Sequence, residues 1–142
     1  MDINIKLIDG GKMPEYKHDS DACADCCARI AVDVLTIPAG GRCLVPLGFA
    51  LELPDGYEAV IRPRSGLSKI GVDSAIGTID SGFRDEISAC LINNTGEERK
   101  VVNGDRICQM KIQEARKFNF VQVDELSDSD RGKNGWGSTG MR

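Results

Sequence analysis

The chain has 142 residues, which predicts one domain with a sizeable core. Its net charge of −4 and single histidine argue against a nucleic-acid duplex as a partner. No stretch approaches the ~20 apolar residues of a membrane span, and the N-terminus lacks a signal-peptide pattern. We therefore expect a soluble, cytoplasmic protein.

Short runs of alternating or apolar residues, separated by turn signals, predict strands along most of the chain. In the first half these runs cover residues 3–7, 30–35, 42–53 with a break at Pro46, and 57–61. In the second half they cover residues 72–79, 87–92, 106–112 and 118–123. A short helix is plausible only over 65–71, where Ser65 could cap it and Gly71 could end it. This spacing, with 16 glycines for tight turns, predicts an all-β sandwich or barrel.

The composition changes at Ser127. Residues 127–142 are polar and rich in glycine and cannot contribute to a core. We therefore predict a β domain over residues 1–126, followed by a flexible C-terminal arm over 127–142.

Three of the six cysteines form the cluster Cys23-x-x-Cys26-Cys27, which suggests a metal or redox site. A structural zinc site needs about four well-spaced ligands, and neither a second CxxC pair nor a histidine pair accompanies this cluster. We favour reduced thiols over a zinc site.

The segment Arg64-Ser65-Gly66, at the start of the predicted helix, has the outline of an anion site. Free backbone N–H groups at a helix start favour phosphate, glycine allows close approach, and Arg64 and Ser65 add donors. The alternative is a plain helix cap with a surface arginine.

The arm carries Arg131, the lone Trp136, Ser138 and Thr139 among glycines. Such a segment offers backbone donors to phosphate, and a tryptophan can stack on a base with about 1–3 kcal/mol. The alternative is a disordered tail, which we consider less consistent with a tryptophan between two glycines. Asp80, Asp25 and Gln109 are each ambiguous alone, since a carboxylate at a strand end is usually a turn former.

Five segments taken together, in order and over nearly the whole chain, resemble the trimeric dUTPases, the deoxyuridine 5′-triphosphate nucleotidohydrolases. The first is eroded, with Cys23 where the family usually has glycine, and Asp85 replaces the usual glycine of the third. The segments are Ala22-Cys23-Ala24-Asp25, Pro63-Arg64-Ser65-Gly66-Leu67-Ser68, Gly77-Thr78-Ile79-Asp80-Ser81-Gly82-Phe83-Arg84, Gly104-Asp105-Arg106-Ile107-Cys108-Gln109, and Arg131-Gly132-Lys133-Asn134-Gly135-Trp136-Gly137-Ser138-Thr139-Gly140.

The resemblance implies hydrolysis of dUTP to dUMP and pyrophosphate, which limits uracil in DNA and supplies dUMP for dTMP synthesis. Asp80 would be the general base for a water that attacks the α-phosphorus. Mg²⁺ would be chelated mainly by the triphosphate and would keep water ligands, which Asp25 would touch from the second shell.

The resemblance also assigns the substrate contacts. Phe83 would lie against the deoxyribose, where the family usually has tyrosine, and we expect discrimination against ribose to be retained. Uracil would meet Trp136 and the hairpin 74–80, which contains Ser74, Gly77, Thr78 and Ile79. The phosphate contacts would come from Arg64, Ser65, Gly66 and Gln109, and from Arg131, Gly137, Ser138 and Thr139 of the arm.

The implied fold is a jelly-roll-like β-barrel that assembles as a homotrimer, with each arm closing over a neighbouring active site. The barrel would then be the catalytic domain.

Two rival functions stay open at this point. A dCTP deaminase shares the fold but needs a catalytic glutamate ten residues past Asp80, where this chain has Cys90, and an arginine where it has Lys69. Release of ammonia from dCTP would identify a deaminase. A regulator that binds a repressor protein could coexist with catalysis, and retained partner binding by Asp80→Ala would support it.

Overall fold

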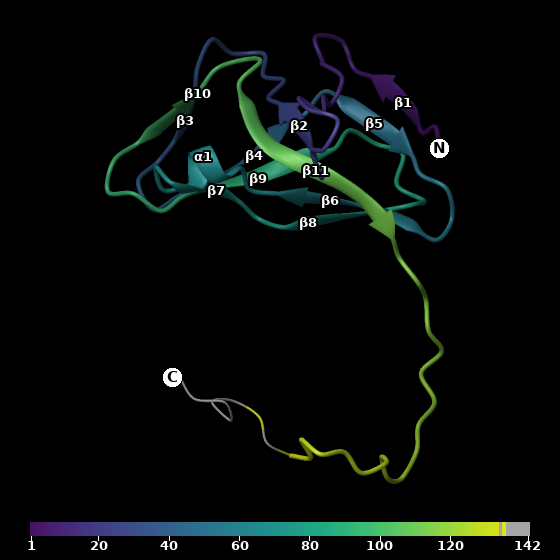
Figure 1. The fold of residues 1–142 in the computed structure, drawn as a ribbon. Coiled ribbons are helices and arrows are strands. Elements are labelled where there is room, and N and C mark those ends of the chain that lie inside the picture. The colour runs from purple at the N-terminus through teal and green to yellow at the C-terminus, as the bar shows by residue number, and fades with distance from the viewer. Residues whose placement is uncertain (134, 136–142) are drawn as a thin grey trace.

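The computed structural model describes residues 1–133 and 135, and within them the chain forms eleven strands and one short helix (Figure 1). The strands of the first half are β1 (Asn4–Leu7), β2 (Ala24–Cys27), β3 (Leu35–Ile37), β4 (Arg42–Pro46), β5 (Phe49–Glu52) and β6 (Tyr57–Arg62). The helix and remaining strands are α1 (Ser65–Ser68), β7 (Val72–Ser74), β8 (Gly77–Asp80), β9 (Ser88–Asn93), β10 (Arg99–Val101) and β11 (Arg106–Glu114).

The strands pair into four antiparallel sheets. The largest has the order β2-β11-β6-β8, a second has the order β4-β9-β7, and β1-β5 and β10-β3 form two-stranded sheets. The all-β, jelly-roll-like architecture predicted from the sequence is confirmed. In the described part of the chain the sheets stay separate, so the backbone hydrogen bonds do not close into one continuous barrel.

One hydrophobic core lies between these sheets. Residues of β9 alternate between half-buried and buried, as expected for a strand with one face against a core. Phe49, Leu47 and Leu91 are completely buried in this core. The same alternation buries Asn93, whose amide donates to the carbonyls of Ile37, Pro38 and Glu97 at 2.8–3.1 Å.

Two glycines allow the N-terminal segment to pass close to the β4–β5 connection. The N–H of Ile8 donates to the carbonyl of Gly48 at 2.8 Å. A Cβ atom on Gly11 would lie 2.0 Å from that carbonyl oxygen, and Gly48 itself has φ +79°. Only glycine fits at either position, which ties the start of the chain to the body.

The predicted strand over 30–35 is wrong. The chain crosses between sheets there, with β2 ending at Cys27 and β3 beginning at Leu35. The N–H groups of Arg29 and Ile30 are taken by the carbonyl of Pro46 and the side chain of Asn103 instead of a neighbouring strand. Val32 and Val34 are exposed, so their alternation did not reflect burial.

The predicted strand over 118–123 is also wrong within this chain. The body's last strand ends at Glu114, and the following segment runs outside the sheets (Figure 1). A strand needs a partner for its backbone groups, and none lies beside this segment in the described part of the chain. Residues 99–101, which the sequence analysis did not assign, form β10 against β3. The described residues contain no helix long and apolar enough to cross a bilayer.

Candidate active site

A polar cleft of about 400 Å³ opens beside α1. It is lined by the five residues Asp25, Arg64, Ser65, Gly66 and Gln109 that the sequence analysis selected, together with Asp21, Ala22 and Cys23. The five come from three distant parts of the sequence, and the large sheet brings them together.

The register of β2 and β11 places Asp25 and Gln109 side by side. Gln109 lies opposite Asp25 on one flank and opposite Arg62 of β6 on the other. A residue of a central strand therefore reaches both neighbours, and its Nε2 donates to the carbonyl of Pro63 at 2.8 Å. This bond holds the Gln109 amide beside the start of α1.

Arg64 is bound on both sides. Its Nε and Nη2 donate to Oδ1 and Oδ2 of Asp25 at 2.9 and 3.1 Å, which is the bidentate geometry that guanidinium groups favour. Its Nη1 donates to the carbonyl of Arg106 at 2.9 Å. Both side chains of the pair are mostly buried, so the guanidinium is held at a defined place in the cleft wall.

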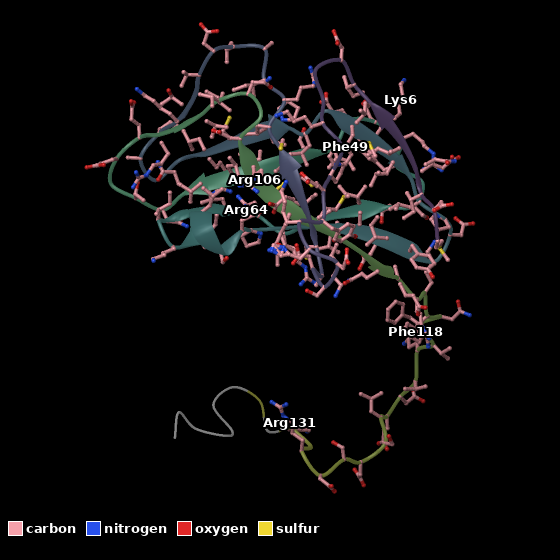
Figure 2. All side chains as sticks on the ribbon, turned by 45° about the horizontal axis from the view of Figure 1, so that its top comes forward. Lys6, Phe49, Arg64, Arg106, Phe118 and Arg131 are labelled. Atoms are coloured by element: carbon pink, nitrogen blue, oxygen red, sulfur yellow. The ribbon has the colours of Figure 1, made fainter. Side chains whose placement is uncertain are left out.

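Arg106 contacts the cleft residue Asp25, although the sequence motif that contains it predicted no role for it. Its Nη1 lies 3.5 Å from Oδ2 of Asp25, so two arginines flank one carboxylate. Arg64 and Arg106 lie next to one another in Figure 2. The signal in the sequence was the position of Arg106 three residues before Gln109 on a predicted strand. The sequence could not indicate which carboxylate it would meet, because that depends on the register and bulge of β2 against β11.

The start of α1 differs from the expectation. Arg64, not Ser65, is the residue that precedes the helix, and its side chain makes no capping hydrogen bond. The first N–H groups bonded within the turn are those of Leu67 and Ser68, to the carbonyl of Arg64 at 3.0 and 2.9 Å. In the described part of the chain the N–H groups of Ser65 and Gly66 have no partner, and the space around Gly66 is open. Both donors are therefore available to a ligand in the cleft.

Asp80 lies elsewhere. It ends β8 opposite Glu58 of β6, and Glu58 is six residues before Arg64. Gln109 of the cleft lies opposite Arg62, four residues farther along β6 than Glu58, so at about 3.3 Å per strand residue Asp80 and Gln109 are about 13 Å apart along that strand. The carboxylate of Asp80 is exposed and has no hydrogen-bond partner among the described residues. One copy of the chain therefore does not bring Asp80 to the cleft.

The remaining predicted site residues lie outside the cleft, some on β8 and others elsewhere in the chain. Gly77, Thr78 and Ile79 lie on β8 and pair with β6. Phe83 is 42% exposed beside Asp80, whereas Ser74 is 4% exposed and its Oγ is buried without a partner among the described residues. Arg131 lies on the segment that leaves the body (Figure 2). Trp136, Gly137, Ser138 and Thr139 lie outside the described residues.

The end of the Asp80 segment is anchored by an ion pair. Arg29 donates through Nε and Nη2 to Glu86 at 2.7 and 2.6 Å, and the N–H of Gly48 donates to the same carboxylate at 2.9 Å. The hydrogen bond from Arg29 holds the pKa of Glu86 below its usual range. The hairpin expected over residues 74–80 is wrong, because β7 pairs with β9 whereas β8 pairs with β6. Asp80 is thus exposed, while the segment that follows it is fixed to the body at Glu86.

The six cysteines are free. Cys26 and Cys108 are buried opposite one another on β2 and β11. The hydrogen bond with the Cys108 thiol and burial raise the pKa of the Cys26 thiol, so it stays protonated. In the described residues, no group of three or more His, Cys, Asp or Glu side chains is arranged to hold a metal ion.

Comparison with known proteins identifies the family of this chain. The family model for dUTPase matches residues 9–140. The chain belongs to the dUTPase family. The deoxyuridine 5′-triphosphate nucleotidohydrolase of Treponema denticola is 44% identical to it over 144 residues, which cover 99% of each chain.

Solved structures of the dUTPase family share the fold. The dUTPase of Staphylococcus bacteriophage 80alpha with dUPNHPP superimposes with a TM-score of 0.90 at 23% identity, covering 98% of each chain. A mutant dUTPase of phage phi11 of S. aureus, described for its coordination of a structural Mg(II) ion, gives a TM-score of 0.81 at 18% identity. That comparison covers 90% of this chain and all of the phage chain.

Proposed function

We infer that this protein is a dUTP diphosphatase, which hydrolyses dUTP to dUMP and pyrophosphate. The observation that carries the proposal is the cleft beside α1, in a chain of the dUTPase family. Arg64, Gln109 and the free N–H groups of Ser65 and Gly66 converge there from separate elements. Such a set of donors suits the oxygens of a polyphosphate. The deaminase alternative gains no support, since the curated relative quoted above is named as a dUTP nucleotidohydrolase.

Asp80 is proposed as the general base. Its backbone is held by pairing with Glu58 and by the bond from the N–H of Phe83 to its carbonyl at 3.0 Å, while its carboxylate stays open. A base needs this combination, because it must be positioned yet free to accept a proton from water. The water would then attack the α-phosphorus, and pyrophosphate would leave.

Mg²⁺ is proposed to arrive with the triphosphate. The cleft offers two carboxylates, those of Asp21 and Asp25. Oδ2 of Asp21 accepts the N–H groups of Lys17 and His18, and both oxygens of Asp25 accept bonds from Arg64. This donor set is too small for an all-protein cage but fits contact through the waters that Mg²⁺ retains. The bound ion would neutralise phosphate charge and orient the chain of phosphates. Asp25 would then both hold Arg64 and contact those waters.

We propose that the active form is a homotrimer whose sites combine residues of different copies. Within one chain Asp80 and Arg64 are too far apart to act on one phosphate, whereas a neighbouring copy could present its Asp80 segment to the cleft. Symmetric oligomers commonly build sites in this way. Phe83 and the backbone of Gly77, Thr78 and Ile79 would arrive with Asp80 and contact the sugar and base.

The C-terminal segment supports assembly. Phe118 is 75% exposed and Phe120 is completely exposed, on a stretch that leaves the body (Figure 2). Apolar side chains of this size are expected to be covered by another surface. The arm over 127–142, with Arg131, Trp136, Gly137, Ser138 and Thr139, is proposed to close over a neighbouring site. The boundary at residue 126 stays a prediction.

The test is pyrophosphate release from dUTP, dTTP, dCTP and UTP. Wild type should prefer dUTP, and Asp80→Asn should lower kcat by about 10²- to 10⁴-fold, the usual contribution of a general base. Asp85→Asn is the matched control, because it removes another exposed carboxylate of the same segment and can still accept the bond from the N–H of Glu86. Full activity of Asp80→Asn would overturn the mechanism, and preference for another nucleotide would overturn the function.

A further inference from the structure

A second pocket, distinct from the polar cleft, lies between α1 and the β3–β10 sheet. Its volume is about 370 Å³. Seven of its twelve lining residues are apolar: Ile37, Leu67, Ile70, Val72, Leu91, Val101 and Ile107. They come from α1 and the segment after it, and from β3, β7, β9, β10 and β11.

Basic side chains outnumber acidic ones in the lining of this pocket. Arg64, Arg99, Lys100 and Arg106 line it, with Asp105 as the one acidic residue among its lining residues. Asp105 accepts the N–H of Val102 at 2.9 Å, so its carboxylate is committed to the turn before β11. Arg64 and Arg106 are both committed to Asp25 of the cleft. Lys100 lies 3.8 Å from Glu98 at an exposed position.

Arg99 is the group without a partner. Its Nε is buried and has no hydrogen-bond partner among the described residues. A buried donor of a charged group is unfavourable when it is left unpaired, and a guanidinium beside apolar walls attracts an anion more strongly than one in water. Guanidinium also matches a carboxylate in shape, with two parallel N–H donors.

We propose that this pocket binds a small organic acid, an apolar ring or short chain that carries one carboxylate. The carboxylate pairs with Arg99 and the apolar part contacts the walls formed by α1, β10 and β11. The volume suits a molecule the size of a two-ring aromatic acid, since ligand pockets begin at about 300 Å³. The site is separate from the nucleotide cleft, although Arg64 lines both.

The probe for the test is 1-naphthoate, titrated into the full-length protein with methyl groups labelled for NMR. We expect saturable shifts of the methyl signals of Val101 and Ile107, and no displacement of the probe by a non-hydrolysable dUTP analogue. The neutral analogue 1-naphthalenemethanol should bind at least tenfold more weakly, because it cannot pair with the guanidinium.

Arg99→Met removes the charge and keeps an apolar side chain, and should weaken binding of 1-naphthoate at least tenfold. Arg42→Met, at an exposed position of β4, is the matched control and should leave the affinity unchanged. A thermal melt identifies any variant that fails to fold, and in that case Arg99→Gln replaces Arg99→Met.

Three results would overturn the proposal. Equal affinity of wild type and Arg99→Met would mean that Arg99 is not the anchor. Displacement by the dUTP analogue would place the probe in the nucleotide cleft. The absence of shifts at millimolar probe would mean that the pocket is closed, for example by a second copy of the chain.

Discussion

The cleft beside α1 and the Asp80 segment, residues 77–86, are organised in opposite ways. In the cleft the side chains of Arg64 and Gln109 already donate to other parts of the chain, Arg64 to Asp25 and Gln109 to the carbonyl of Pro63. In the Asp80 segment the side chains of Asp80 and Phe83 are exposed, and order comes from the backbone pairing of β8 with β6. The binding groups are thus arranged within one copy, whereas the proposed reacting group is presented outward.

This difference has a physical reason. A polyphosphate site gains from donors that are fixed before the ligand arrives, because less conformational freedom is lost on binding. A general base must instead keep an unoccupied carboxylate for its water. A carboxylate already bound to arginine, as Asp25 is, would be a poor base, and Asp80 has no such partner among the described residues.

The largest expected effect comes from mixing two inactive variants. Asp80→Asn lacks the proposed base, and Arg64→Lys keeps the charge beside Asp25 but loses the bidentate fork. If each site combines Arg64 of one copy with Asp80 of another, random co-assembly of equal amounts makes about a quarter of the sites intact. Pyrophosphate release should then rise at least tenfold above either variant alone.

Two controls accompany the mixing experiment. The variants mixed after assembly, without unfolding, should stay inactive until subunits exchange. Wild type mixed with an equal amount of Asp80→Asn should keep about half of its activity, since half of the sites then contain an intact Asp80. Activity that stays at the average of the two variants would contradict a shared site.

A smaller effect is expected at Phe83, an exposed residue of the Asp80 segment. Phenylalanine keeps the ring that we propose lies against deoxyribose, so kcat/KM for UTP should be more than tenfold below that for dUTP. Phe83→Ala should narrow this ratio and Phe83→Tyr should preserve it. Steady-state kinetics with both nucleotides is the measurement. A wild-type ratio within tenfold, about 1.4 kcal/mol, would rule out the ring as the sugar sensor.

The smallest effect concerns the ion pair between Arg29 and Glu86, which anchors the end of the Asp80 segment. Because Arg29 lowers the pKa of Glu86, the ionised carboxylate stabilises the fold above its unfolded pKa of about 4.3, and this contribution is lost as pH falls through the folded pKa. Glu86→Gln should therefore lower the free energy of unfolding by about 1–2 kcal/mol at pH 7 and by much less near pH 3.

Urea unfolding at both pH values measures this difference. Glu98→Gln is the control, since Glu98 is exposed and its pair with Lys100 is loose at 3.8 Å. We expect this control to behave as wild type at both pH values. If Glu86→Gln lowers the free energy of unfolding equally at pH 7 and pH 3, the charge of Glu86 is not what stabilises this contact.

Much of the fold could be predicted from local pattern. Strands with one buried face, such as β9 and β11, were found because alternation along a strand reports burial. The predictions over 30–35 and 118–123 failed because alternation does not reveal whether a partner strand exists. The N–H of Ile30 donates to the side chain of Asn103 and not to a strand, and residues 118–123 have no partner strand within the described chain.

The sequence by itself determined the family, the all-β class and the residues of the phosphate cleft, because these follow from the order and type of residues in short motifs. Only the tertiary structure decided that Arg106 joins Arg64 at Asp25, that the Nε of Arg99 lies unpaired in a second pocket, and that Asp80 ends β8 opposite Glu58, outside the cleft. Motifs specify chemistry locally, whereas strand register and sheet order set which groups meet.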